Sequence, residues 1–194
     1  WRWEGGLEAA ETLRLCAFNV ISIITGTGYS TADYNTWGSF AVTAFFMFMF
    51  IGGCAGSTSC GIKIFRFQVL YAAVRTQMGR LLQPHGVFIA NFNRRPIPES
   101  VMDSVMSFFF LFALGFAVLA VLLSLLGLDF LTAVSGAGTA IANVGPGLGQ
   151  VIGPSGTFAP LPDAAKWLLS AGMLLGRLEL LTVMVLFTPT FWRG

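Results

Sequence analysis

The stretch SIITGTGYSTADYNTW, residues 22–37, places glycines and hydroxyl side chains in the middle of an apolar sequence. It overlaps the end of the apolar segment 13–24, LRLCAFNVISII, which is shorter than the roughly 20 residues that a helix needs to cross the hydrocarbon core of a membrane. A more apolar segment, FAVTAFFMFMFI at 40–51, follows. This order predicts a half-helix and then an irregular loop at 25–29. Such backbone is tolerated at membrane depth only where protein buries it or where it lines a water-filled path.

The composition indicates a membrane protein. The 194 residues are 55% hydrophobic and 10% charged, whereas a soluble domain carries about 25% charged residues. The net charge of +2 and the lack of a basic run interleaved with aromatic residues argue against a nucleic-acid partner. No Ser/His/Asp set, metal cluster or pair of carboxylates in one segment indicates an enzyme. We therefore predict an all-α polytopic membrane protein without catalytic activity.

The distribution of charge predicts how the chain crosses the membrane. No acidic residue lies between Asp33 and Glu99, but six basic residues do: Lys63, Arg66, Arg75, Arg80, Arg94 and Arg95. Basic residues gather on the cytoplasmic side of membrane proteins, so segment 67–100 is predicted to be a cytoplasmic loop. The segments that are long enough to cross the membrane are 37–66, 102–127 and 164–192.

The second half of the chain repeats the order of parts in the first half. Segment 129–142, DFLTAVSGAGTAIA, is again apolar and short, and NVGPGLG at 143–149 follows it. Gly28 and Gly145 occupy equivalent places, 117 positions apart. Both half-helices enter from the outer face if the basic segment lies inside, so the two halves are predicted to be parallel copies of one unit.

The glycines of both loops suit the binding of a cation. Rings of backbone carbonyls replace the hydration shell of a cation without introducing full charges. Glycine permits the backbone conformations that align carbonyls along an axis, and Gly26, Gly28, Gly145 and Gly147 stand where this is needed. Each half-helix also points its C-terminal end, worth about half a negative charge, at the same place. The two loops are therefore predicted to be walls of a cation filter.

The two predicted copies are 1–66 and 101–194, on either side of the predicted loop 67–100. The first copy is expected to contain a pore helix at 13–24, a filter loop at 25–29 and a broken inner helix at 37–66. The second copy is expected to contain an outer helix at 102–127, a pore helix at 129–142, a filter loop at 143–149 and an inner helix at 164–192. We expect the first copy to lack its outer helix.

Four motifs carry a resemblance to a known family: TGTGYSTADYNTW, FIGGCAGSTSCGIKIFR, NVGPGLG and GRLELLTVMVLFTPTFWR. In this order and spacing, over nearly the whole chain, they resemble the C-terminal half of the TrkH/KtrB superfamily of bacterial potassium transporters, and TrkH in particular. The resemblance implies helix–pore-helix–helix repeats around one pseudo-fourfold cation pore. This chain would supply the third and fourth repeats, without the first helix of the third.

The resemblance also implies roles for individual residues. One filter wall would consist of Thr25, Gly26, Thr27 and Gly28, and another of Asn143, Val144, Gly145 and Pro146. An intramembrane loop that blocks the pore would lie beside Arg177, and the gate residues would be Gly52, Gly53, Gly56, Ser57, Thr58, Gly61 and Arg177. The sequence departs from the family pattern where Gly26, Tyr29, Ser59 and Cys60 stand, and the latter two imply a less flexible gate loop.

The resemblance further implies what the protein transports and where it acts. K+ would be the transported ion, bound by the filter residues, with no organic cofactor on this chain. The protein would be a homodimer in the bacterial inner membrane, surrounded by lipid. A cytoplasmic nucleotide-binding subunit of the TrkA/KtrA type would regulate it.

Simpler interpretations of these motifs stay open. The loop at 25–29 could be an extracellular turn, and the glycines at 52–61 could serve close helix packing. A Walker loop is excluded there because Lys63 does not directly follow Gly61. Arg177 could pair with Glu179, but residues i and i+2 lie on different helix faces. Bonds from Arg177 to loop carbonyls and a barrier to cations are therefore favoured.

Several functions also stay open. The first is K+ uptake, and the alternatives are a non-conducting membrane scaffold or assembly subunit, or a Na+-coupled K+ symporter. Two filter walls cannot close a fourfold ring. The other walls are expected to belong to a longer native chain, with a second copy of this chain as the alternative.

Overall fold

The computed structural model describes residues 9–57, 59–83, 85–92 and 95–178, and most of them are helical. In chain order the elements are α1 (Ala9–Ile24), η1 (Tyr34–Trp37), α2 (Ser39–Phe50), α3 (Ile64–Leu82), β1 (Asn91–Phe92), β2 (Arg95–Pro96), α4 (Glu99–Leu125), α5 (Phe130–Ala142), α6 (Gly149–Ile152) and α7 (Asp163–Arg177). The two short strands pair antiparallel. The predicted all-α fold class is confirmed.

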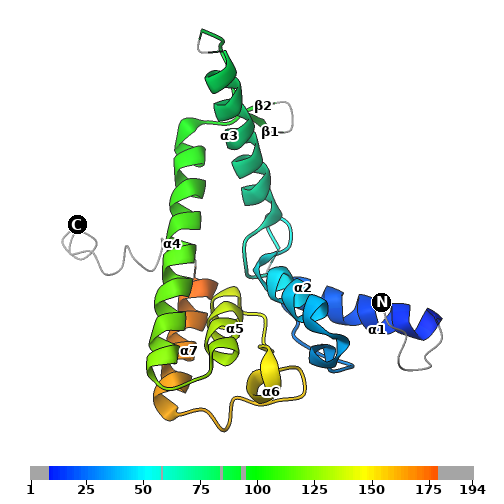
Figure 1. Ribbon diagram of the computed structural model, residues 1–194. Coiled ribbons are helices and arrows are strands. Elements are labelled where there is room, and N and C mark those ends of the chain that lie inside the picture. The colour runs from blue at the N-terminus through cyan, green and yellow to red at the C-terminus, as the bar shows by residue number, and fades with distance from the viewer. Residues whose placement is uncertain (1–8, 58, 84, 93–94, 179–194) are drawn as a thin grey trace.

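The half-helix α5 lies at the centre of the fold. It packs against α2, α4 and α7, and every residue from Ser135 to Ala142 is buried. In Figure 1, α5 and α7 lie beside the lower part of the long α4, and α3 lies beside its upper part. Because the side chains of α5 are mostly small, its neighbours approach closely. Protein therefore encloses this half-helix, as backbone that ends at membrane depth requires.

Two glycines let α7 rest directly on α5. A Cβ on Gly172 would lie 2.6 Å from a methyl carbon of Leu119 and 3.4 Å from the Cβ of Ala140. A Cβ on Gly176, one helical turn further on, would collide with the carbonyl oxygen of Ile141. This is the small-xxx-small pattern of closely packed membrane helices. It brings the end of α7 against the end of α5, where the second predicted filter loop begins.

Aromatic rings connect the two predicted copies. Phe46 and Phe50 of α2 both contact Phe116 of α4, with ring centroids 6.4 and 5.5 Å apart. Within the first copy, Tyr34 stacks on Phe45 at 4.0 Å. Such pairs contribute roughly 0.5–1.5 kcal/mol each beyond their buried area. The rings thus hold α2 against the helices of the second copy.

In segment 37–66, for which a broken helix was expected, α2 ends at Phe50 and α3 begins at Ile64. The segment after it differs from what the sequence predicted. The predicted loop at 67–100 is helical in its first half, since α3 continues to Leu82. The basic residues of this segment indicate the cytoplasmic side of the membrane, not the secondary structure. Arginine, glutamine, leucine and methionine are nevertheless good helix formers, and no proline interrupts α3.

Among the described residues, α4 is the helix long and apolar enough to cross a membrane. It begins slightly before the predicted start and has 27 residues. Apolar side chains such as Phe110 and Leu114 stand on its exposed face, as on a helix that contacts lipid or further protein. The third predicted segment, 164–192, is described only as far as α7 and the residue after it.

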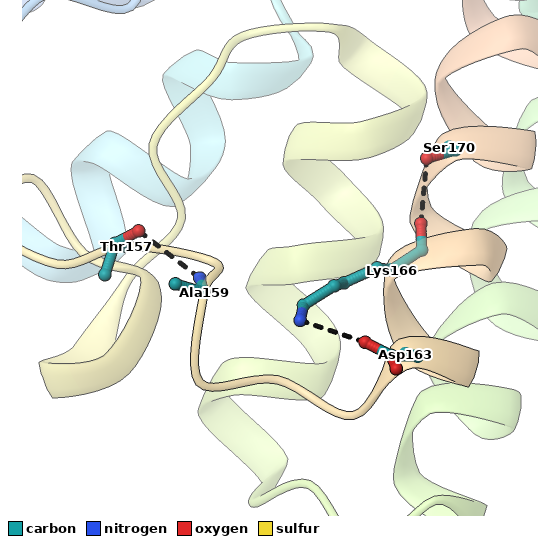
Figure 2. Close-up of polar contacts among 5 residues, drawn as sticks. All are labelled: Thr157, Ala159, Asp163, Lys166 and Ser170. Carbon is teal, nitrogen blue, oxygen red and sulfur yellow. Dashed lines mark hydrogen bonds and ion pairs between the residues drawn. The ribbon is translucent and has the colours of Figure 1, made fainter.

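The chain enters α7 through a turn with local polar contacts, shown in Figure 2. The N–H of Ala159 donates to the hydroxyl of Thr157 at 3.3 Å. In the first turns of α7, Lys166 pairs with Asp163 at 3.2 Å, and the hydroxyl of Ser170 donates to the carbonyl oxygen of Lys166 at 2.8 Å. The carboxylate of Asp163 also complements the positive end of the helix dipole. Exposed pairs of this kind contribute little to stability.

Asp129 caps α5, and replacing it with alanine is expected to lower stability by about 1 kcal/mol. Its carboxylate accepts the N–H of Thr132 at 3.1 Å, and the side chain and N–H of Thr132 hold the pKa of Asp129 below its usual value. A lowered pKa means that the cap stabilises fully above the unfolded-state pKa, about 3.9, and is lost as pH falls through the folded-state value. Thermal unfolding in detergent at several pH values measures both effects.

The control for this prediction is Asp163→Ala, which removes a carboxylate from the start of α7. Pro162, not Asp163, is the N-cap of that helix, so the change should stay within about 0.5 kcal/mol of the wild type. Equal effects of the two substitutions would contradict a capping role for Asp129.

Candidate cation filter and gate

The first predicted filter loop, residues 25–28, turns its N–H groups back onto the end of α1. The N–H groups of Thr27 and Gly28 both donate to the carbonyl oxygen of Ser22, at 3.0 and 3.3 Å. Gly26 and Gly28 have φ values of +71° and +76°, which glycine adopts without strain. Among the hydrogen bonds of the described residues, none ends on a carbonyl oxygen of residues 25–28. The N–H groups of this loop are thus hydrogen-bonded, whereas its carbonyl oxygens accept no hydrogen bond from the described residues.

The second predicted filter loop, residues 143–146, has the same arrangement. Thr139 accepts the N–H of Val144 on its carbonyl oxygen at 3.1 Å and the N–H of Gly145 on its hydroxyl at 2.9 Å. The φ of Gly145 is +120°, and that of Asn143 is 51°. In the described part of the chain, no hydrogen bond ends on a carbonyl oxygen of this loop either. Two separate half-helices thus end in loops whose carbonyl oxygens accept no hydrogen bond from residues that the structure describes.

The two loops lie backbone to backbone. A Cβ on Gly28 would collide with the carbonyl oxygen of Val144 and lie 3.3 Å from the ring of Pro146. A Cβ on Gly145 would lie 3.4 Å from the Cα of Gly28. The loops border a cavity of about 340 Å³, lined from their side by Thr27, Gly28, Tyr29, Gly145 and Pro146. The structure therefore brings together the two predicted walls.

The loop between α2 and α3 contains all of the predicted gate residues except Arg177, and it is closed at its neck. Ile51 and Ile62 form a parallel bridge, in which the N–H of Gly52 donates to the carbonyl oxygen of Ile62 at 3.0 Å. A Cβ on Gly52 would collide with the carbonyl oxygen of Cys60. Gly61 has a φ of +77°. Glycine is thus required where the two arms of the loop approach each other.

Serine side chains hold the interior of this loop. The hydroxyl of Ser59 accepts the N–H of Gly53 at 2.7 Å and lies 2.8 Å from the hydroxyl of Ser57. Ser57 also donates to the carbonyl oxygen of Cys54 at 2.7 Å. Gly56, with a φ of +85°, lies at the exposed tip. Ser59, a departure from the family pattern, therefore has a structural role in closing the loop.

Arg177 lies beside this loop. Its Nη1 is 2.9 Å from the sulfur of Cys60, so the guanidinium contacts the loop at this thiol. A cavity of about 220 Å³ separates the loop from the helices, and Lys63 and Arg66 line it together with Arg177. The guanidinium of Arg66 stacks 3.6 Å above the ring of Phe108. Three positive side chains therefore line this one cavity.

The end of α7 joins the filter region to the loop region. The side-chain amide of Asn143 donates to the carbonyl oxygen of Met173 at 3.0 Å, and a Cβ on Gly176 would lie 2.9 Å from that amide. The next residue, Arg177, reaches the loop at Cys60. One helix end therefore contacts both predicted sites. Of the predicted gate residues, Thr58 lies outside the described residues.

Sequence reasoning missed three polar residues near the filter loops: Asn19, Asn35 and Ser135. Asn19 and Ser135 are fully buried in the half-helices α1 and α5. A lone asparagine in the apolar segment 13–24 was a usable signal, because a buried amide needs hydrogen-bond partners. The partner of Asn35 lies 114 residues away, so no local pattern could indicate it.

Apolar helices, two half-helices between them and paired glycine loops are typical of membrane transport proteins. A family model described as "TrkH: Cation transport protein" matches residues 5–193, and the chain belongs to this family. The resemblance noted from the motifs is confirmed. Since this is a family of transporters, the prediction that the protein is not an enzyme is confirmed as well.

Relatives agree with this assignment. The chain is 56% identical over 193 residues to the Trk system potassium uptake protein TrkI of Halomonas elongata, and 38% identical over 186 residues to TrkH of the same organism. These alignments cover 100% and 96% of this chain but 39% and 38% of the relatives. The crystal structure of the potassium transporter TrkH from Vibrio parahaemolyticus superposes with a TM-score of 0.87 at 36% identity, over 96% of this chain and 39% of that one. The chain spans about two-fifths of the length of these relatives.

Proposed function

We propose that this chain forms part of the pore of a Trk-type K+ uptake system and supplies two of the four walls of its filter. The observation that carries the proposal is the meeting of two loops whose N–H groups are hydrogen-bonded and whose carbonyl oxygens accept no hydrogen bond in the described part of the chain. Relatives named for potassium uptake support K+ as the transported ion. A longer native chain would supply the remaining walls, which agrees with the greater length of the relatives.

In the proposed filter, K+ exchanges water for carbonyl oxygens of residues 25–28 and 143–146. Cations bind there because the C-terminal ends of α1 and α5 direct their negative dipole ends at the loops. The positive φ values of Gly28 and Gly145 support this role, because they turn the carbonyls without a side chain in the way. No full charge is needed, so the ion is held weakly enough to move on.

The proposed gate is the loop at 52–61 together with Arg177. The closed neck of the loop and its serine contacts support this role, because they hold the loop together as one structural unit. Arg177, with Lys63 and Arg66 at the same cavity, would repel a cation that has passed the filter. Displacement of the loop from Arg177 would open the path.

The surroundings of the protein are also proposals. We place it in the bacterial inner membrane as a homodimer, with lipid around the exposed apolar face of α4. Arg75 and Arg80 of α3 and Arg95 of β2 would lie in the cytoplasm, within reach of a regulatory subunit of the TrkA/KtrA type. Any nucleotide would bind to that subunit.

The test is K+ uptake by a bacterium that lacks its own K+ uptake systems and carries the complete gene that encodes this chain. Rescue of growth at low K+, with uptake that persists when Na+ is removed, would support the proposal. Uptake only in the presence of Na+ would indicate the symporter. A protein that is present in the membrane without any uptake would indicate the scaffold.

A further inference from the structure

The side chain of Asn35 bridges the two filter loops. It comes from η1, just after the first loop, and its Nδ2 donates to the carbonyl oxygen of Gly149 at 3.2 Å. Its Oδ1 accepts the N–H of Gly149, also at 3.2 Å. The amide therefore pairs with both backbone groups of one residue in the other predicted copy, a geometry that matches its donor and acceptor.

Two buried side chains anchor the ends of this bridge to the half-helices. In the first copy, Asn19 of α1 accepts the N–H of Thr31 at 3.2 Å and donates to its hydroxyl at 3.1 Å. In the second copy, the hydroxyl of Ser135 of α5 accepts the N–H of Leu148 at 3.0 Å and donates to its carbonyl oxygen at 3.3 Å. Thr31 and Leu148 each stand three residues after the filter glycine of their copy. In both copies, a polar side chain of the half-helix thus holds the residue three positions after the filter glycine.

These contacts form one continuous path from α1 to α5. Asn19 holds the segment that leads to Asn35, Asn35 holds Gly149, and Ser135 holds the residue before Gly149. We propose that Asn35 is a positioning residue that sets the spacing between the two filter walls and thereby the discrimination between K+ and Na+. This inference rests on the proposed filter function.

The packing around the bridge supports its importance. A Cβ on Gly153 would collide with the carbonyl oxygen of Gly149 and with Nδ2 of Asn35. Gly153 has an ordinary negative φ, so the space for the amide, not backbone strain, requires a glycine there. A second polar contact between the copies, from the hydroxyl of Ser30 to the carbonyl oxygen of Pro154 at 3.0 Å, lies beside the bridge.

The two hydrogen bonds of Asn35 are the kind of contact that can set ion discrimination. Cations of different radius are distinguished by the number and position of the carbonyl oxygens that coordinate them. Loss of both hydrogen bonds lets the walls move relative to each other and is expected to change the K+/Na+ uptake ratio roughly tenfold. A substitution that only lowered the stability of the protein would change the amount of protein in the membrane but not this ratio.

The experiment measures K+ and Na+ uptake by cells that carry the complete gene, with the amount of protein in the membrane determined by immunoblot. Asn35→Leu keeps the branched shape of the side chain and removes both bonds, so the uptake ratio should fall roughly tenfold. Asn35→Asp keeps the acceptor for the N–H of Gly149, so the uptake ratio should fall less than in Asn35→Leu. Gly153→Ala removes no polar atom but displaces the amide, so it should also lower the ratio.

The matched control is Thr36→Val. Thr36 follows Asn35 in η1, and its hydroxyl donates only within that segment, to the carbonyl oxygen of Asp33 at 2.7 Å. The control should keep the wild-type ratio. A wild-type ratio in Asn35→Leu or, if that variant does not reach the membrane, in Gly153→Ala or Asn35→Asp would overturn the inference.

The filter itself is tested separately with Gly28→Ala in the same cells. If Gly28→Ala transports K+ like the wild type, the proposed function fails. If Gly28→Ala loses uptake while Asn35→Leu keeps the wild-type ratio, the filter stands and only the role of Asn35 is lost.

Discussion

Gly28→Ala is expected to reduce K+ uptake roughly hundredfold, because a barrier higher by about 3 kcal/mol slows a rate by that factor. The added Cβ would collide with the carbonyl oxygen of Val144, which belongs to the other filter loop. An L-residue at a φ of +76° also costs about 1–2 kcal/mol. The two walls would have to separate, and carbonyl oxygens of both would leave their positions. Uptake of K+ or Rb+ by a K+-uptake-deficient strain measures the effect.

Gly127→Ala is the matched control for this prediction. Gly127 also has a positive φ, +85°, but a Cβ there would meet nothing within 4 Å, and the residue lies in the turn between α4 and α5. It should bear the same backbone strain and keep uptake near the wild-type level. Uptake lost equally in both variants would trace the effect to strain. Uptake retained in Gly28→Ala, with the protein in the membrane, would mean that the loop is a simple turn.

Arg177→Ala is expected to raise K+ uptake in cells that lack the regulatory subunit. Two unit charges about 10 Å apart repel by roughly 1.7 kcal/mol at an effective dielectric constant of about 20, so removing one charge from the path should raise the rate on the order of tenfold. Loss of the contact with Cys60 acts in the same direction, because it frees the loop. Initial rates of K+ uptake, normalised to protein in the membrane, give the result.

Lys166→Ala controls for the loss of a positive charge from α7. Lys166 stands near the other end of the same helix, where it pairs with Asp163, as Figure 2 shows. Its removal should leave uptake unchanged. Unchanged or lower uptake in Arg177→Ala would refute the role of Arg177 as a barrier.

The half-helices and their loops could be predicted from the sequence because their determinants are local. Segment 13–24 is too short to cross the membrane, and the observed α1 ends at Ile24, directly before the glycines. Likewise, α5 ends at Ala142, where the segment 129–142 was expected to end. Apolar length and glycine spacing are both properties of neighbouring residues, so one sequence suffices to find them.

The course of the chain between 51 and 100 was harder to predict. Basic residues indicate the side of the membrane but not the secondary structure, and the helix α3 was therefore interpreted as loop. The sequence indicated bonds from Arg177 to carbonyl groups of the loop. Its contact with the thiol of Cys60 depends on how the loop folds, so one sequence could not predict it.

The bridge through Asn35 lies beyond what one sequence can indicate. Its two partners are 114 residues apart, and only the packing of both copies brings them together. Asn19 and Ser135 are intermediate cases. Each is a polar residue in an apolar half-helix, which predicts a nearby partner but does not say which one.

The hydrogen bonds behind the two filter loops also imply an order of assembly during synthesis. Asn19 and Thr31 are 12 residues apart, and Ser135 and Leu148 are 13 apart, so each wall can close as soon as its own segment has been made. Closing a short loop costs little chain entropy, whereas the contact between Asn35 and Gly149 must wait for the second copy. The two walls would therefore form one after the other during synthesis, and the hydrogen bonds of the Asn35 amide to Gly149 would join them last.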